Sequence, residues 1–438
     1  MIRNYFFALY CATSSFAYTQ SIDTAKLNTY FNTLKQHDKF MGSVAVSKNG
    51  TIVYTKSTGF SDVATSSVAT EHSGYRIGSI SKTFTAVLVM KAVEENKLTL
   101  NQSIEPFFPG IRQYKKITIQ DLLNHRSGIH NFTDDKKYLS WNTKSKTKSE
   151  LVKIIATGGV DFKPGKKAAY SNSNYVLLTY ILEDVFRQSY ATLIQTYIAQ
   201  PLNLRNTYVG QEIKPQENEC RSYSYTNGWK EAPETAASIP LGSGGIVSTP
   251  TDLVRFSDGL FTGKLISKES LTNMQTMQDG VGSGLFILPF YEKTGYGHRG
   301  GIDKFTSVFS YFPEDSISFA LVSNGTNYNN NEIPLTVLNA VFERPFEVPD
   351  FSVYTIDPTT LDQYIGNYSS EQIPLQITIS KEGDNLIAQA TGQNPKPLTA
   401  SKAHTFRFDE TGIVLQFIPA ENMIHLQQGG SLFVFVRK

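Results

Sequence analysis

Apolar and polar positions divide the chain before Val341 into strand, helix and strand regions. Alternating residues over Ser43 to Ser47 and Thr51 to Thr55 predict a hairpin about Lys48-Asn49-Gly50, and alternation returns over Thr306 to Phe312 and Ser316 to Ser323. Apolar runs predict helices over Asp23 to Lys35, Ser81 to Glu95, Ile119 to Asn124, Ser149 to Ala156, Tyr175 to Phe186 and Tyr190 to Ile198. Strands at both ends with helices between them predict an antiparallel sheet, closed by both ends of the region, with a helical insert.

The pattern changes after Val341. The proline-containing stretch Arg344 to Asp350 is typical of a linker, and from Tyr364 onward short alternating runs are separated by turn residues. The predicted strands include Leu375 to Ile379, Asn385 to Gln389, Gly412 to Ile418, Met423 to Gln427 and Leu432 to Val436. We therefore expect a linker over residues 344–360 and a second, all-β domain over residues 361–438.

The first residues have the pattern of an export signal. Arg3 supplies a short positive region, Tyr5 to Ala12 an apolar one, and Ser15-Phe16-Ala17 a small-x-small cleavage site. This predicts a signal peptide over residues 1–17 and a periplasmic or secreted protein. The apolar stretch is shorter than the ~20 residues that span a bilayer. Lipidation of Cys11 is the less favoured alternative, because the bulky Tyr10 precedes it.

The composition limits the class of protein but does not indicate an activity. The chain has 438 residues and is 40% hydrophobic, which is enough for two globular domains. Its 41 basic and 39 acidic residues give a net charge of +2, and Lys144 to Lys148 is the one basic cluster that stands out. Nucleic acid binding is therefore not expected. Cleavage of the signal would leave Cys220 as the only cysteine, so no intramolecular disulfide is expected.

Ser79 and Lys82 form the first candidate catalytic pair. They lie three residues apart at the start of the predicted helix, so they share one helix face, and the positive end of the helix favours developing negative charge. A neighbouring amine can activate a serine hydroxyl as a nucleophile. Ser145 and Lys148 have the same spacing, but they lie in a polar, lysine-rich stretch that is typical of a solvated surface.

Tyr170 and Asn172 form the second candidate pair. They follow the turn at Pro164-Gly165 and precede the apolar run Val176 to Leu182, so both side chains could point into one cleft. Tyr170 would move protons and Asn172 would orient the substrate or Lys82. Taken alone, the pair is more typical of a structural tyrosine beside a turn asparagine than of a catalytic pair.

The third element is the glycine-rich stretch Gly295 to Gly301, which precedes a predicted strand. Glycines allow a backbone to approach a ligand closely, as an extended, peptide-like substrate at a strand edge requires. A glycine-rich hairpin with no ligand is the alternative.

These three elements, in this order, resemble the serine β-lactamase and penicillin-binding protein superfamily, and specifically the class C β-lactamase-like serine hydrolases. The resemblance runs from about Leu27 to about Phe342 and includes the stretches Ile117 to Ile129 and Gly242 to Leu253. It implies a hydrolase domain over residues 18–343 with a two-part fold, α/β plus all-α, and an active site between the two parts. The C-terminal domain, opening with Tyr364-Ile365-Gly366-Asn367-Tyr368, resembles a lipocalin-like β-barrel. We give a packing role for this barrel about twice the weight of a ligand-binding role.

The resemblance assigns catalytic roles to the first two pairs. Ser79 would be the acylated nucleophile, Lys82 and Tyr170 would share the work of general base and acid, and Asn172 would position groups in the cleft. Which of Lys82 and Tyr170 is the base stays open at this point.

By the same resemblance, His298, Arg299 and Gly300 occupy the place of a Lys-Thr-Gly triplet and would bind substrate, and the backbone N–H groups of Ser79 and Gly301 would form the oxyanion hole. His298 replaces a charged lysine by a group that titrates near neutrality, and Arg299 replaces a small hydroxyl by a charged fork. Both changes argue against β-lactam hydrolysis, and the histidine, which is common at this position in esterase-like and peptidase-like relatives, favours those activities. Arg299 is expected either to bind a substrate carboxylate or to point to solvent.

Other hydrolase classes lack their signatures. The remaining histidines form no His-Glu-x-x-His pair and no cysteine-histidine cluster, so neither a metal nor another cofactor is expected, and His125 and His130 are interpreted as hydrogen-bonded loop residues. No Gly-x-Ser-x-Gly elbow, phosphate loop or dinucleotide fingerprint occurs.

The sequence thus predicts an exported serine hydrolase that forms an acyl-enzyme with a small-molecule or peptide substrate. Cell-wall D-amino peptides are the leading substrate class, followed by small esters and β-lactams. The alternative is a catalytically weak protein that binds penicillin or wall peptides without turnover.

Overall fold

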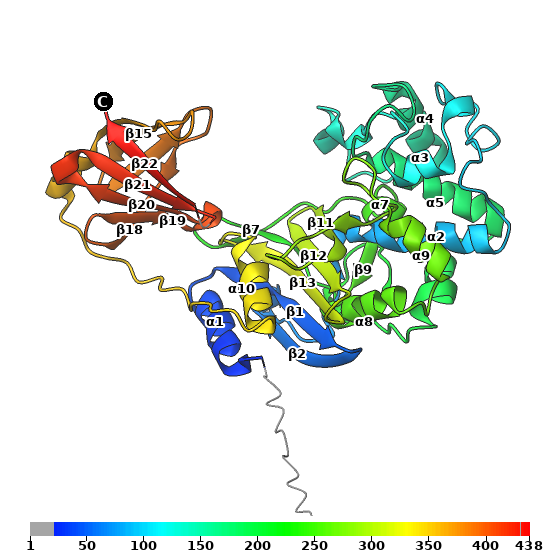
Figure 1. Cartoon of the computed structure of the whole chain (residues 1–438), viewed down its shortest axis with the longest axis horizontal. Coiled ribbons are helices and arrows are strands. Elements are labelled where there is room, and N and C mark those ends of the chain that lie inside the picture. Colours follow the sequence, from blue (N-terminus) through cyan, green and yellow to red (C-terminus); the bar gives the residue numbers. More distant parts are fainter. Residues whose placement is uncertain (1–21, 430) are drawn as a thin grey trace, which may run out of the picture.

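The computed structural model describes residues 22–429 and 431–438 (Figure 1). The predicted signal peptide and Cys11 lie outside these ranges. Within them, no helix combines the length and the apolar character needed to cross a membrane.

An antiparallel sheet of six strands forms the base of the first domain. Its strands, in spatial order, are β10 (Phe286–Ile287), β11 (Tyr296–Ile302), β12 (Phe305–Phe312), β13 (Ile317–Thr326), β1 (Phe40–Lys48) and β2 (Thr51–Thr58). The N-terminal hairpin joins the later strands through the pairing of β1 with β13, where Ala45 lies opposite Ala320. The predicted sheet, closed by both ends of the domain, is confirmed.

Helices cover both faces of this sheet and form a separate helical part (Figure 1). Their bounds are α1 (Thr24–Gln36), α2 (Ser81–Glu94), α3 (Ile119–Leu123), α4 (Lys148–Gly158), α5 (Asn172–Phe186), α6 (Tyr190–Ile194), α7 (Leu241–Gly244), α8 (Pro250–Phe261), α9 (Lys268–Gln275) and α10 (Glu332–Val341). The helix predicted from Tyr190 ends earlier than expected, because its last turn, Gln195–Ala199, is a π-helix.

Short strands and turns connect these elements. The strands are β3 (Phe60–Asp62), β4 (Ser67–Val68), β5 (Tyr75–Arg76), β6 (Tyr208–Val209), β7 (Tyr223–Tyr225), β8 (Trp229–Glu231) and β9 (Ile246–Ser248). Three 3-10 turns border the site described below, namely η1 (Gly78–Ile80), η3 (Phe132–Asp134) and η4 (Tyr138–Ser140).

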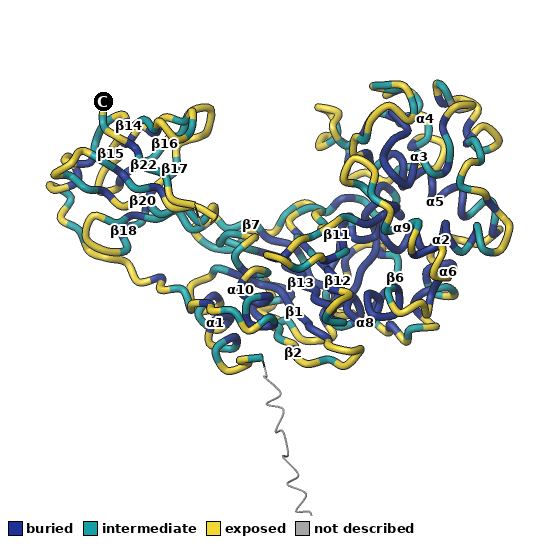
Figure 2. Tube along the Cα trace, viewed as in Figure 1, coloured by how far each residue is buried: buried dark blue, intermediate teal, exposed yellow. Residues whose placement is uncertain are grey.

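Side-chain alternation on β13 separates two cores. Phe319 and Leu321 pack with α1 and α10, whereas Ala320 and Val322 belong to the larger core with α2, α5 and α8. Figure 2 shows this buried centre as continuous dark tube through the sheet and into the helical part. Helices α2 and α5 are buried on nearly all sides, so polar residues on them lie deep in the domain.

The C-terminal domain is a nine-stranded antiparallel sheet that closes almost into a barrel, which confirms the predicted all-β module. In spatial order its strands are β17 (Lys396–Pro397), β16 (Asn385–Ala390), β15 (Gln376–Glu382), β14 (Gly366–Ser369), β22 (Ser431–Arg437), β21 (Met423–Gln428), β20 (Ile413–Ile418), β19 (Thr405–Phe408) and β18 (Thr399–Lys402). Apolar side chains fill its interior, among them Tyr364, Phe406, Phe417 and Phe435. A filled interior favours the packing role over the ligand-binding role.

The barrel contacts both the first domain and the linker. Lys39 Nζ, directly before β1, lies 2.6 Å from Asp409 Oδ2 of the barrel, and Arg407 of the barrel donates to the carbonyl oxygen of Asp350 in the linker at 2.6 Å. Glu410 of the barrel lines a cavity of about 540 Å³ together with Gly301 and Asp303 of the catalytic domain. The barrel therefore borders the region where the sequence places the oxyanion hole.

Candidate active site

Ser79 lies on the 3-10 turn η1, directly before the buried helix α2. The turn packs against β11 through Gly78, whose φ of +50° is in the left-handed region. A β-carbon on Gly78 would lie 2.7 Å from the backbone nitrogen of Gly301, which is closer than any side chain tolerates. Glycine at this position therefore holds the serine against the edge of the sheet.

Lys82 is fully buried one helical turn after Ser79. Its Nζ atom lies 3.1 Å from Ser79 Oγ, 2.7 Å from Asn172 Oδ1 and 2.6 Å from the carbonyl oxygen of Ser243. In the described part of the chain no carboxylate forms an ion pair with it. Burial consequently lowers the pKa of the Lys82 ammonium well below its usual range.

The contacts of Lys82 fix the direction of its lone pair. The carbonyl oxygens of Asn172 and Ser243 can only accept hydrogen bonds, so they take the two N–H groups of a neutral amine. The third direction faces the hydroxyl of Ser79. The hydroxyl can therefore donate its proton to the amine, which is the arrangement that a general base requires.

Asn172 is itself held at the start of α5. Its backbone N–H donates to Asn131 Oδ1 at 2.9 Å, and its Nδ2 donates to Thr133 Oγ1 at 3.0 Å. Because the amide nitrogen is occupied by Thr133, the amide oxygen must face Lys82. The segment around η3 thus orients Lys82 through Asn172.

Tyr170 closes one side of the site. Its ring lies 4.8 Å from Lys82 Nζ, and since the residue is 40% exposed, part of the ring borders the open cleft. Burial of the hydroxyl end raises the pKa of Tyr170, and a hydrogen bond with Ser79 opposes this only in part. Tyr170 is therefore a protonated phenol at neutral pH, able to donate a proton rather than to accept one.

His298 differs from the expectation of a group that titrates near neutrality. It is buried beside Phe286, and burial together with the nearby Lys82 lowers the pKa of His298 to about 3. Its Nδ1 faces the carbonyl oxygen of Arg299, so Nδ1 carries the proton of the neutral ring. Its Nε2 is buried without a hydrogen-bond partner. His298 thus offers an uncharged acceptor.

The side chain of Arg299 lies on the other face of the sheet. His298 pairs with Phe309, which belongs to the core around α2, whereas Arg299 pairs with Val308, which packs with α1 and α10. Its guanidinium is exposed and donates to Asn331 Oδ1 at 3.2 Å. This placement favours the outward-pointing alternative, because successive side chains of a strand alternate between faces.

The two glycines after Arg299 allow the strand to pass the nucleophile. The stretch predicted as a close-approach element is itself strand β11. A β-carbon on Gly300 would lie 2.1 Å from the carbonyl oxygen of Ile77, where Ser307 Oγ donates at 2.7 Å. Around Gly301 the nearest atom to a β-carbon would be 3.9 Å away, so this backbone is open to the cleft.

Two cavities meet at Ser79. One, of about 270 Å³, is lined by Asn172, Ser243, Gly301 and Asp303, and the other, of about 440 Å³, by Tyr170, Phe286, His298 and Gly301. Asp303 is the charged side chain among the residues that line the smaller cavity. The nucleophile therefore has room for an acyl group on one side and for a leaving group on the other.

Asp303 belongs to a buried ionic cluster. Arg76 pairs with both Glu234 and Asp303, so the three groups together carry one net negative charge when ionised. Asp303 Oδ1 accepts hydrogen bonds from the backbone and the hydroxyl of Thr235. The smaller cavity thus has a negative wall.

Sequence reasoning did not identify Asp303, Ser243 or His125 as parts of the site. Ser243 contributes a carbonyl oxygen, which leaves no side-chain signal. His125 is hydrogen-bonded, as interpreted, because its Nδ1 accepts from the backbone of Ser171 at 3.0 Å. Its ring, however, also packs against Tyr170 at 4.4 Å, and burial lowers the pKa of His125 well below its usual range.

Comparison with known proteins places this geometry in context. The β-lactamase family model matches residues 29–341. Penicillin-binding protein 4* of Bacillus subtilis is 26% identical over 431 residues, which cover 90% of this chain and 94% of that protein. Teichoic acid D-alanine hydrolase of Staphylococcus aureus is 28% identical over 306 residues, which cover 68% and 73%. The structure of D-amino acid amidase from Ochrobactrum anthropi SV3 superposes with a TM-score of 0.65 at 26% identity, covering 73% of this chain and 99% of the amidase.

We predict that Gly300→Ala disables the site while the protein stays folded. The added β-carbon collides with the Ile77 carbonyl oxygen and pushes β11 away from Ser79. A displacement of about 1 Å in a catalytic site costs roughly 100-fold in rate, so kcat/KM should fall by about that factor. Gly110→Ala, where a β-carbon meets no atom within 4 Å, is the control. Equal activity of the two variants, with circular dichroism showing both folded, would contradict the close packing.

Proposed function

The chain belongs to the β-lactamase family, as its motifs predicted, and within that family of serine hydrolases we propose that it cleaves D-aminoacyl esters or amides through an acyl-enzyme on Ser79. The observation that carries this proposal is the contact of the buried Lys82 amine with Ser79 Oγ at 3.1 Å. A buried, neutral amine beside a serine hydroxyl at the start of a helix is the minimum equipment for acyl transfer.

In the first step, Ser79 Oγ attacks the substrate carbonyl and its proton passes to Lys82. The amine is neutral before the attack because burial disfavours the ammonium. The backbone N–H groups of Ser79 and Gly301 would receive the oxyanion that forms, since both line the same cavity. Of the two candidate bases, the lone-pair direction favours Lys82.

In the second step, the ester or amide bond breaks and the leaving group takes a proton. Tyr170, a neutral phenol at Ser79, is placed to donate that proton and to recover one from Lys82. Water then attacks the acyl-serine, with Lys82 again as the base, and releases the free acid. Each proton that Lys82 accepts is returned within one turnover, so the cycle closes without a cofactor.

The negative wall of the smaller cavity favours a substrate with a free amino group. Asp303 lines that cavity, and its cluster with Arg76 and Glu234 carries one net negative charge when all three groups are ionised. An α-ammonium group beside Ser79 would be attracted there, whereas the carboxylate of a penicillin would be repelled. The relatives include an amidase of D-amino acids and a hydrolase of D-alanyl teichoic acid, both of which carry the D-amino acid in their names.

We predict that D-alanine methyl ester and D-phenylalanine amide are hydrolysed faster than their L-enantiomers and their N-acetylated forms. N-acetylation removes the charge that Asp303 attracts, so we expect kcat/KM to fall about tenfold or more. Intact-mass spectrometry should show a Ser79-dependent aminoacyl adduct that is absent in Ser79→Ala. A stable penicillin adduct without any turnover would instead indicate a binding protein. No adduct with any of these compounds would contradict the proposed function.

We predict that kcat/KM falls as the pH is lowered through the depressed pKa of Lys82. Protonation places a charge on the amine and removes the lone pair that faces Ser79. In Asn172→Asp a carboxylate replaces the amide at 2.7 Å and stabilises the ammonium, so the acid limb should move to higher pH by roughly 1–3 units. His298→Gln is the control, because the low pKa of His298 keeps it neutral in this range. If the acid limb of the kcat/KM profile shifted in His298→Gln and not in Asn172→Asp, the general base would be a group other than Lys82.

We also propose that the protein is exported after cleavage behind Ala17. Expression of the full chain in a bacterium should yield a mature protein that begins at Tyr18, as read by N-terminal sequencing. Cys11→Ser should not alter this processing. A block of processing by Cys11→Ser would favour the lipoprotein alternative instead.

A further inference from the structure

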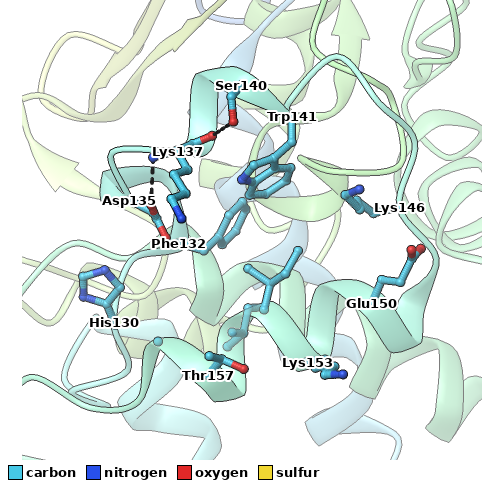
Figure 3. A pocket seen from close by; sticks show the side chains of 13 residues that line it. His130, Phe132, Asp135, Lys137, Ser140, Trp141, Lys146, Glu150, Lys153 and Thr157 are labelled. Carbon is cyan, nitrogen blue, oxygen red and sulfur yellow. Dashed lines mark hydrogen bonds between the residues drawn. The ribbon is translucent and has the colours of Figure 1, made fainter.

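A second cavity lies in the helical part (Figure 3), and it shares the stretch from η3 to η4 with the cleft beside Ser79. Its volume is about 530 Å³. Phe132 and Trp141, with ring centres 6.2 Å apart and nearly parallel planes, form one wall, and Ile154 and Ile155 of α4 form the floor. The mechanism described above does not use this cavity.

Three lysines line the opening of this cavity, namely Lys137, Lys146 and Lys153. None of them has an ion-pair partner within the described ranges. Two carboxylates also line the cavity, so its three ammonium groups and two carboxylates together leave a net charge of +1. Asp135 accepts from the N–H of Lys137 at 2.7 Å, and Glu150 accepts from the N–H of Thr147 at 2.8 Å. The lining therefore keeps a net positive charge.

The cavity is separated from the active site by a single stretch of chain. Phe132 lines both the cavity and the cleft beside Ser79. Within the same stretch, Ser140 and Trp141 line the cavity, whereas Tyr138 and Leu139 line the cleft. A ligand that occupies both sites need only cross η4, whose Leu139 is 80% exposed.

The positive charge extends beyond the cavity along the same segment. Between Asp134 and Lys167 the chain holds nine lysines and four acidic residues, a net charge of +5, although the whole chain carries only +2. The lysines are Lys136, Lys137, Lys144, Lys146, Lys148, Lys153, Lys163, Lys166 and Lys167. In the described ranges only Lys148 has an ion-pair partner, Asp184. The last three lie on the loop that leads to Tyr170, so free cations continue from the cavity toward the catalytic tyrosine.

A row of free cations fits a ligand with repeated negative charges better than a single small anion, because each charge can find its own partner. We propose that this surface and its cavity bind a polyol-phosphate polymer whose hydroxyl groups carry the D-aminoacyl ester that enters the catalytic cleft. This inference rests on the proposed function and names the carrier of its substrate. Acyl transfer then breaks the ester bond, forms the Ser79 ester and releases the polymer hydroxyl with the proton from Tyr170. Water hydrolyses the Ser79 ester to the free D-amino acid.

The test compares one acyl group on two carriers. D-alanyl poly(glycerol phosphate) and D-alanine methyl ester are given to the wild type, to Lys137→Gln/Lys146→Gln/Lys153→Gln, and to the control Lys35→Gln/Lys264→Gln/Lys268→Gln. The control removes three exposed lysines outside the basic segment. We expect KM for the polymer to rise about tenfold or more in the cavity variant alone, since several exposed charges are lost together. Kinetics with the methyl ester should stay unchanged.

Salt gives a second readout of the same interaction. At about 1 M NaCl, where charges are screened over about 3 Å, the wild type and the cavity variant should have the same KM for the polymer. Equal effects of the two triple variants on the polymer, or an equal effect of the cavity variant on both substrates, would overturn the proposal.

Fluorescence separates docking from catalysis. The chain has two tryptophans, Trp141 in the cavity and Trp229 in β8, so Trp229→Phe leaves Trp141 as the only reporter. Unesterified poly(glycerol phosphate) should change its emission, whereas inorganic phosphate at the same phosphate concentration should not. A polymer response without D-alanine release from either ester would leave docking intact and contradict the proposed function. Release of D-alanine from the methyl ester without a fluorescence response to the polymer would support the proposed function and contradict docking of the polymer.

Discussion

Burial of one uncompensated amine is the constraint on which the rest of this active site depends. An ammonium group without a carboxylate partner costs several kcal/mol in the interior, so burial lowers the pKa of Lys82 at the expense of stability. Three elements share that cost by giving Lys82 its contacts. Helix α2 carries it, Asn172 at the start of α5 accepts from it, and the carbonyl of Ser243 in α7 accepts from it. A site that needs a base at neutral pH can thus use lysine, provided that every neighbour is an acceptor rather than an anion.

The two-part fold supplies the remaining geometry. The sheet contributes β11, whose glycines let Ser79 lie against it, while the buried helices α2 and α5 bring their N-terminal ends to the same point. Those helix ends carry partial positive charge, which suits the negative charge that develops on the attacking oxygen and the oxyanion. Because both helices are buried on nearly all sides, they hold these ends rigidly. The barrel adds a border, through Glu410, without entering the cluster around Lys82.

The sequence could predict the features that rest on a hydrophobic periodicity or on the spacing of reactive side chains. Alternation predicted the sheet, apolar runs predicted most helices, and the spacing of Ser79 and Lys82 predicted a pair of side chains that the fold brings to 3.1 Å. What could not be predicted depended on burial and on the backbone. The interior lowers the pKa of His298 to about 3, although imidazole titrates near neutrality in water. The alternation of side chains along β11 turns Arg299 away from the cleft. The sequence could not predict this, because it does not tell which face of the strand packs against which core. The contact of Ser243 with Lys82 uses a backbone carbonyl oxygen, and since every residue has one, no residue type in the sequence could predict it.

The segment from Asn131 to Asn142 connects the chemistry to the proposed docking surface. Asn131 and Thr133 hold Asn172, and Asn172 directs the lone pair of Lys82 toward Ser79. Phe132, between them in sequence, lines the second cavity, whose opening holds Lys137, Lys146 and Lys153. Any ligand that packs against Phe132 therefore presses on the residues that orient the catalytic base. A displaced Asn172 would leave a buried N–H group of Lys82 without an acceptor, which costs free energy. Displacement of this segment is therefore unfavourable. The exposed turn at Leu139 lies between the two cavities, where the proposed polymer would cross.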